Sequence, residues 1–233
     1  PLRVLDDEGL GYSDDIYNAI LYAVAEDADV INMSFGSSVD SEFISLGLAT
    51  ASASDVVLVA AAGNSAADVN ATPFYPACNE DVIGVGAINT DDTQAVFSNY
   101  GSDCVDISAP GVNIYSTLYT DDATYGFTDD YGYLSGTSMA APVVSGAAAL
   151  LLEQALPETT SAGAGLADYL YTYADDVGLG VSMGAGRLNV YGSLACFAGV
   201  PSSPSTIRAY TKQNGTAISQ ATRTKDTTPY FSW

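Results

Sequence analysis

The chain has 233 residues, of which 28 are acidic, 6 are basic and none is histidine, so its formal net charge is −22. A protein this negative repels nucleic acid and anionic membranes, which argues against both as partners. The length is sufficient for one well-buried domain, and no apolar run reaches the roughly 20 residues that span a membrane. Three cysteines without a Cys-x-x-Cys pair, and the lack of histidine, argue against zinc and haem sites.

Short apolar runs alternate with longer helical patterns along the first part of the chain. The strand candidates are Arg3–Leu5, Val30–Met33, Val56–Ala61, Val82–Val85 and Val105–Ile107. The helix candidates are residues 12–25, 43–52, 138–154 and 165–174. Apolar strands that alternate with helices are typical of a parallel sheet covered on both faces. We therefore predict an α/β fold with a doubly wound, mostly parallel sheet.

The composition changes near residue 201. Residues 1–200 contain 27 of the acidic residues and two arginines, whereas residues 201–233 contain four basic residues and one aspartate. Ser-Pro spacing and apolar-aromatic runs in this tail predict a linker and the beginning of a β-sandwich-like module. The first strand candidate lies at the very start of the chain and the tail stops where such a module would form its core. We therefore expect the chain to be cut at both ends.

The string Gly136-Thr-Ser-Met-Ala-Ala-Pro142 places a serine in the first turn of an apolar helix. The free amides and the positive end of a helix favour an oxyanion that forms beside such a serine. Serine is also a common N-cap, and a serine at a helix start is, on its own, far more often a cap than a nucleophile.

A second string, Val59-Ala-Ala-Ala-Gly-Asn64, is an apolar strand that ends in small residues and an amide. An asparagine at a strand end can donate a hydrogen bond to a tetrahedral oxyanion, although asparagine is also common in turns. A third string, Asp29-Val-Ile-Asn-Met-Ser-Phe-Gly36, is another strand with polar and small residues after it.

Together, and in this order along the chain, the three strings resemble segments of the subtilisin family of serine proteases. The resemblance covers roughly residues 1–195 and implies a peptidase domain over residues 1–200. It implies an endopeptidase that acts on protein or peptide substrates, with Ser138 as nucleophile and Asn64 as oxyanion donor. It also implies that Gly9, Leu10 and Gly11 pair with the substrate backbone, while two further segments form the S1 walls. Those wall residues are Ser34, Phe35, Gly36, Ala61, Ala62 and Gly63.

Cys78 and Cys104 lie in strings that resemble the proteinase K-like branch of this family. By count alone these two cysteines could pair in an oxidising compartment, which leaves Cys196 over. The resemblance implies that they do form a disulfide. It also implies a structural Ca²⁺ held by Asp106 and by the carbonyls of Glu80 and Val82, where the alternative is an aspartate that only bonds a turn. A secreted, extracellular protein is the corresponding expectation.

The chain departs from the family because it contains no histidine. A serine-protease triad needs a base and a carboxylate that orients it. The resemblance places both in an N-terminal segment of the same domain that this chain lacks. That segment is removed, or it remains as a separate associated piece, or the parent protein is a catalytically inactive scaffold for assembly or attachment. We expect the segment to exist and to complete the domain.

Overall fold

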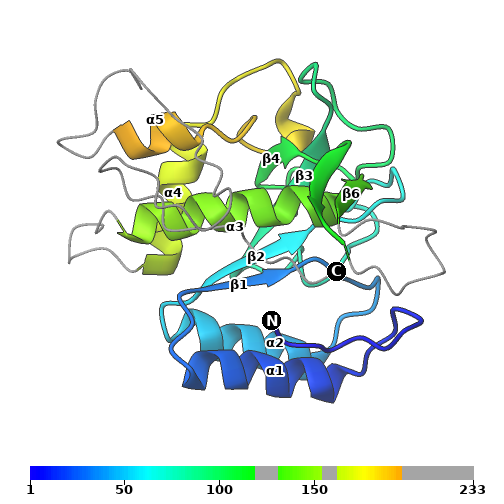
Figure 1. Cartoon of the computed structure of the whole chain (residues 1–233), viewed down its shortest axis with the longest axis vertical. Helices are drawn as coiled ribbons and strands as arrows, with labels where there is room; N and C mark the ends of the chain where they lie inside the picture. The colour runs from blue at the N-terminus through cyan, green and yellow to red at the C-terminus, as the bar shows by residue number, and fades with distance from the viewer. Residues whose placement is uncertain (119–130, 154–161, 196–233) are drawn as a thin grey trace, which may run out of the picture.

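The computed structural model describes residues 1–118, 131–153 and 162–195 (Figure 1). Its centre is a four-stranded parallel sheet with the strand order β1-β2-β3-β4. The strands are β1 (Val30–Met33), β2 (Val57–Ala61), β3 (Val82–Ile88) and β4 (Ile107–Pro110). The predicted α/β fold with a parallel sheet is confirmed.

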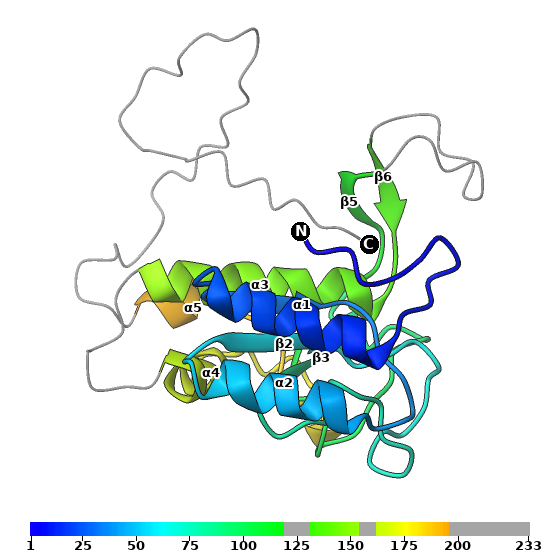
Figure 2. The ribbon, with the colours of Figure 1, turned by 90° about the horizontal axis from the view of Figure 1, so that it is seen from below.

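Helices cover both faces of this sheet (Figures 1 and 2). On one face lie α1 (Ser13–Ala25) and α2 (Glu42–Ser52), which pack against each other. On the other face α3 (Thr137–Glu153) contacts all four strands. The remaining helices are α4 (Ala162–Thr172), α5 (Val190–Ala195) and the short 3₁₀ helix Val181–Met183. Of the described helices, none is both long enough and apolar enough to cross a bilayer.

Strand β2 shows why the sequence folds this way. All five of its residues are buried. Alternate side chains of a strand point to opposite faces, so Val57 and Val59 enter the core under α3, whereas Leu58 enters the core under α1 and α2. A strand with two buried faces must be apolar throughout, which is the pattern that predicted it.

The predicted strands at Arg3–Leu5 and Val105–Ile107 differ from the structure. The predicted strand Arg3–Leu5 is irregular, because no described strand lies beside it to supply ladder hydrogen bonds. The chain turns immediately afterwards, where Asp6 Oδ1 accepts the amides of Glu8 and Leu10. The fourth sheet strand begins at Ile107 rather than Val105, because residues 101–105 form a turn in which Val105 N–H donates to the Gly101 carbonyl.

A small antiparallel pair, β5 (Ile114–Thr117) and β6 (Tyr131–Leu134), stands beside the main sheet and leads into α3. Figure 2 shows this pair projecting from the body near the start of α3. Strand β6 ends at Leu134, four residues before the predicted nucleophile Ser138. The predicted β module at 201–233 and Cys196 lie outside the described residues.

Candidate active site

Ser138 lies in the first turn of α3, directly beyond the carboxyl ends of β1 and β2. Its hydroxyl donates a hydrogen bond of 3.1 Å to the carbonyl of Ser34, the residue that follows β1. Its backbone amide is one of the first-turn N–H groups that have no acceptor inside a helix. The serine is half-buried, so its oxygen is held in place and remains accessible.

The side chain of Asn64 is fixed beside Ser138 by the neighbouring threonine. The backbone N–H of Thr137 lies 2.8 Å from Asn64 Oδ1, and its Oγ1 lies 2.9 Å from the same atom. A backbone N–H can only donate, so this contact determines which end of the amide is oxygen. The Asn64 Nδ2 group is consequently left as a hydrogen-bond donor on an exposed side chain.

Asn99 holds the loop that carries Asn64, and the sequence pattern did not reveal it. Its Oδ1 accepts the amides of Ser65 and Ala67 at 3.0 Å each, and its Nδ2 donates to the Ala62 carbonyl at 2.8 Å. Asn99 is 2% exposed. It lies 35 positions after Asn64 in an irregular segment, so no local periodicity connects the two residues.

A pocket of about 160 Å³ opens beside Ser138. It is lined by Ser34, Phe35, Gly36, Ala61, Gly63, Asn64, Phe74, Thr137 and Ser138. The structure thus brings together five of the six residues expected to form the S1 walls. The sixth, Ala62, is fully buried behind the pocket, where its carbonyl accepts from Asn99.

Phe74 closes one side of this pocket, and the two wall glycines make room for its ring. A Cβ at Gly36 would overlap the Phe74 ring, and a Cβ at Gly63 would lie 3.1 Å from it. Gly63 also has φ +100°, a conformation that residues with a side chain rarely adopt. The glycines therefore allow an aromatic side chain to form part of the pocket wall.

A second, larger pocket of about 330 Å³ adjoins the first through Phe35 and Gly36. Gly9, Leu10 and Gly11, the segment expected to pair with the substrate backbone, line it together with residues of α1 and α2. Leu10 is 67% exposed. An extended peptide that passes Ser138 thus has both a side-chain pocket and a neighbouring exposed backbone segment along its path.

The site brings together a helix-terminal serine hydroxyl and an amide donor, without an ionisable group among the residues that line the pocket. None of the nine residues that line the Ser138 pocket is ionisable, and the sequence has no histidine. The Ser138 proton is instead held by the Ser34 carbonyl, which accepts a hydrogen bond but cannot take the proton at neutral pH. A hydroxyl and an amide donor in this arrangement could take part in acyl transfer if a base were supplied from elsewhere.

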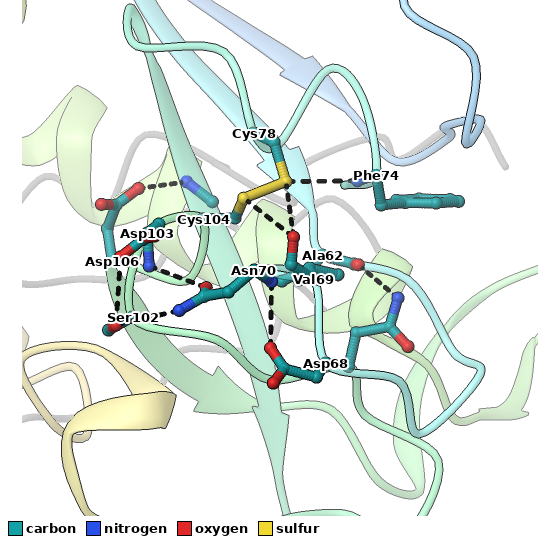
Figure 3. Close-up of a disulfide and its surroundings, with 12 residues drawn as sticks. Ala62, Asp68, Val69, Asn70, Phe74, Cys78, Ser102, Asp103, Cys104 and Asp106 are labelled. Carbon is teal, nitrogen blue, oxygen red and sulfur yellow. Dashed lines mark hydrogen bonds between the residues drawn. A yellow bond between two sulfur atoms is a disulfide. The ribbon is translucent and has the colours of Figure 1, made fainter. Parts of the chain in front are cut away.

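A disulfide joins Cys78 and Cys104, with Cα atoms 4.4 Å apart (Figure 3). The disulfide links the segment that contains the pocket residue Phe74 to the turn before β4. The Phe74 amide donates a hydrogen bond to Cys78 Sγ in that segment. The expected pairing of these two cysteines is thus present in the structure.

Asp106, the expected calcium ligand, follows this disulfide (Figure 3). Its Oδ2 accepts the Gly84 amide at 2.7 Å, and its own amide donates to the Gly84 carbonyl at 2.9 Å. Burial raises the pKa of Asp106, and the Gly84 hydrogen bond partly opposes this. Burial, with the negative charges of Asp106 and Asp168, raises the pKa of Tyr171 well above its usual range.

The carbonyl of Val82 points to the same edge of β3 as that of Gly84, because residues two apart in a strand present their backbone groups to the same side. Glu80 lies in the turn just before β3 and has an exposed side chain. In the described part of the chain, no three or more His, Cys, Asp or Glu side chains come together as a metal cluster. One carboxylate with backbone carbonyls is a different donor set, and these oxygens suit a hard cation.

Comparison with known proteins places these features in one family. The family model described as the subtilase family, Peptidase_S8, matches residues 1–192. Subtilisin NAT from Bacillus subtilis subsp. natto is 40% identical over 190 residues, which are 81% of this chain and 47% of that protein. The thermophilic serine proteinase of Bacillus sp. strain AK1 is 44% identical over 153 residues, or 66% of this chain and 35% of that protein.

A solved structure described as proteases from Pseudoalteromonas arctica PAMC 21717 superposes with a TM-score of 0.73 at 31% identity. The match covers 83% of this chain and 61% of the solved chain. The chain spans less than half the length of the two curated relatives named above. The matched region includes every residue described here around Ser138 and Asn64. The chain belongs to the subtilase family.

Proposed function

We propose that the protein containing this chain is a serine endopeptidase that cleaves peptide bonds through an acyl-enzyme on Ser138. The observation that carries the proposal is the orientation of Asn64, whose Oδ1 is bound by Thr137 so that its Nδ2 is a donor beside the serine. A fixed amide donor next to a helix-terminal serine is the arrangement that stabilises a tetrahedral oxyanion.

In the proposed reaction Ser138 Oγ attacks the carbonyl carbon of the scissile peptide and loses its proton to a base. The carbonyl oxygen becomes negative and accepts hydrogen bonds from Asn64 Nδ2 and from the Ser138 amide. Collapse of this intermediate breaks the C–N bond as the base returns the proton to the leaving amine. Water then hydrolyses the ester by the same steps, and Ser138 regains its proton.

We assign the base and its orienting carboxylate to an N-terminal segment of the same domain, upstream of Pro1. Two facts support this assignment. The chain has no histidine. Within the described residues, β1 pairs only with β2, so its other edge is open directly beside Ser34 and the Ser138 hydroxyl. A further strand at that edge would end at the site, because parallel strands present their carboxyl ends together.

The pocket beside Ser138 supports an apolar residue at the substrate position that precedes the cleaved bond. Its walls are backbone, small side chains and the Phe74 ring, with no charged group among the lining residues. A charged side chain would lose hydration there without gaining a partner. Peptides with Phe or Leu at that position should be cleaved faster than matched peptides with Lys or Asp.

We further propose a structural Ca²⁺ beside β3, held by Asp106 and by the carbonyls of Val82 and Glu80. The donor chemistry fits, because a half-buried carboxylate and a carbonyl at the same strand edge offer hard oxygen ligands. EGTA should lower the melting temperature of the protein, and Asp106→Asn should remove this sensitivity. An unchanged melting temperature in EGTA would contradict the site.

An extracellular location is also proposed. The Cys78–Cys104 disulfide supports it, because such bonds persist in oxidising compartments. The acidic surface is compatible with a soluble protein in a saline medium, where ions screen repulsion between carboxylates. Recovery of the mature protein from the culture medium of its host would be the expected observation.

The proposed activity is tested by treating the full-length protein with a fluorophosphonate probe and mapping the labelled peptide. We expect label on Ser138, which requires a base beside it, and no label on the Ser138→Ala variant. Absence of label in a demonstrably folded sample would contradict the proposal and favour a catalytically inactive subtilase scaffold.

A further inference from the structure

Helix α3 contains a proline, Pro142, four residues after Ser138. In a regular α-helix the carbonyl of residue i accepts the N–H of residue i+4. Proline has no N–H, so the Ser138 carbonyl loses the partner that its own helix would provide. The nucleophile is therefore attached to its helix by one hydrogen bond fewer than its neighbours.

The missing partner is supplied from outside the helix. The hydroxyl of Ser34 donates a hydrogen bond of 2.8 Å to the Ser138 carbonyl. In return, the Ser138 hydroxyl donates to the Ser34 carbonyl at 3.1 Å. The two serines are 104 positions apart in sequence, and this reciprocal pair ties the start of α3 to the end of β1.

The Ser34 hydroxyl is itself oriented by a longer chain of side chains. Asn32 Nδ2 donates to Ser34 Oγ at 2.8 Å, and the Ser145 hydroxyl lies 3.0 Å from Asn32 Oδ1. The same Ser145 hydroxyl is also 3.2 Å from the Ala141 carbonyl in its own helix. Asn32 and Ser34 are two apart, the spacing that places them on one face of an extended segment, here the face toward α3.

From Asn32 onward the donors point the same way, from Asn32 Nδ2 to Ser34 and from the Ser34 hydroxyl to the Ser138 carbonyl. The single proton of the Ser145 hydroxyl is shared between Asn32 Oδ1 and the Ala141 carbonyl at the start of this series. Hydrogen bonds that share a direction polarise one another, which strengthens the last member. With Asn32 Nδ2 donating to Ser34 Oγ, the Ser34 proton is directed at the Ser138 carbonyl.

We propose that Ser34 is a positioning residue for the nucleophile, and that Pro142 makes this role possible by leaving the Ser138 carbonyl available. Ser138 is thereby located relative to β1 and the pocket wall rather than relative to its own helix. This inference rests on the proposed peptidase function, and it predicts that Ser34 and Pro142 are energetically coupled.

The test is a double-mutant cycle in the full-length protein. Ser34→Ala should lower kcat and the rate of fluorophosphonate labelling about tenfold with little change in KM, because the change removes one hydrogen bond that positions the serine. In the Pro142→Ala background the alanine N–H can donate to the Ser138 carbonyl. There, Ser34→Ala should change kcat less than about twofold. An equal loss in both backgrounds would overturn the proposal.

Ser145→Ala separates positioning from the shape of the pocket, because Ser145 does not line it. It should lower kcat in the same direction as Ser34→Ala, by a smaller factor and without a change in KM. Ser54→Ala is the matched control, since Ser54 also donates to a helix carbonyl, that of Thr50, but on α2 and far from the site. A kcat for Ser145→Ala equal to that of Ser54→Ala would exclude Ser145 from the mechanism.

Thermal unfolding keeps the inference distinct from the proposed function. If the wild-type protein is not labelled, the peptidase proposal fails, but the same double-mutant cycle still reports on the hydrogen bond. Ser34→Ala should lower the melting temperature more in the wild-type background than in Pro142→Ala. Equal shifts in the two backgrounds would show that Ser34 and the proline are independent.

Discussion

At the scale of single residues, the site depends on Asn64 being held in one orientation. Thr137 is bound to it through both its amide and its hydroxyl, and that hydroxyl also accepts the Gly63 amide at 3.0 Å. The threonine therefore connects the start of α3 to the segment that follows β2. These contacts fix Asn64 Nδ2 without a substrate, which is the condition that the proposed oxyanion stabilisation requires.

Asn64→Ala should lower kcat by about 10²–10³, with a smaller effect on KM, because the lost donor acts mainly on the developing oxyanion. Steady-state kinetics on a peptide substrate would measure this effect. Asn18→Ala, a change at an exposed asparagine of α1, is the control and should leave both constants unchanged. A kcat within twofold of wild type would contradict the role of Asn64.

The glycines differ in whether a side chain would fit at their positions, and Gly63 and Gly146 allow a direct comparison. Gly63→Ala should lower the free energy of unfolding by about 1–3 kcal/mol, because φ is +100° and the new Cβ would overlap Asn99 Nδ2. Gly146→Ala should raise it by about 0.5–1 kcal/mol, since Gly146 is inside α3 with open space around its Cβ position. Denaturant unfolding of both variants measures the contrast. Equal changes in the free energy of unfolding for the two variants would show that the backbone at position 63 accepts a side chain without strain.

At the scale of elements, hydrogen bonds at both edge strands of the sheet, β1 and β4, join segments that are far apart in sequence. Beside β4, Arg187 connects three such segments. Its Nη1 lies 2.8 and 2.7 Å from the two carboxylate oxygens of Asp92, and its Nη2 lies 2.6 Å from Asp175. The backbone of the same residue bridges Ser108 of β4 and Asp175. One arginine thus holds the C-terminal segments against the sheet in a strongly acidic molecule.

The Arg187 contacts predict a pH dependence. Hydrogen bonds from Arg187 and Asn189 lower the pKa of Asp175 below its ordinary value of 3.8. A group with a lowered folded-state pKa stabilises the protein fully above its unfolded value, and this contribution is lost as the pH falls through the folded value. Arg187→Met should therefore cost about 1 kcal/mol of unfolding free energy near pH 7, and progressively less below about pH 4.

The control for this prediction is Arg3→Met. Arg3 also pairs with an aspartate, Asp7, but both side chains are highly exposed, at 72% and 94%. Its substitution should change the free energy of unfolding by less than about 0.5 kcal/mol at any pH. Urea unfolding at pH 7 and pH 3 compares the two variants. A loss for Arg187→Met that does not shrink in acid would show that packing, and not the ion pairs, is responsible.

At the scale of the whole molecule, the excess of carboxylates makes charge repulsion the main electrostatic effect on stability. The formal charge of −22 produces repulsion that favours expansion of the chain. In 0.1 M salt, the repulsion between exposed charges more than about 10 Å apart is largely screened. Within the described residues, the basic side chains Arg3 and Arg187 are already paired with aspartates. Little positive charge remains in that part of the protein to offset its acidic surface.

The melting temperature should therefore rise by several degrees between low salt and about 0.5 M NaCl, as measured by calorimetry at pH 7. A variant with Glu8→Gln, Glu26→Gln and Glu153→Gln, three exposed sites, should melt higher in low salt and gain less from added NaCl. The same salt increment in the variant and the wild type would indicate that specific ion binding, and not general repulsion, is the cause.

Local patterns in the sequence were enough to predict much of the fold. Buried parallel strands are apolar on both faces and the helices that cover them have one apolar side, so β2 and α3 are visible as runs of residue types. The serine and asparagine strings were likewise local signals. The irregular segment Arg3–Leu5 shows the limit, because an apolar run becomes a strand only where a neighbour completes its hydrogen bonds.

The sequence by itself determined the fold class, the residue types of the site and the excess of acidic residues. Each of these depends only on composition or on the spacing of residues a few positions apart. Only the tertiary structure decided how the residues act together. Asn99 binds the Ser65 amide, 34 positions away. Ser34 donates to the Ser138 carbonyl, 104 positions further on, in place of the N–H that Pro142 lacks. The physical reason is that hydrogen bonds depend on distance and direction between groups that folding brings together, and chain spacing does not encode either of them.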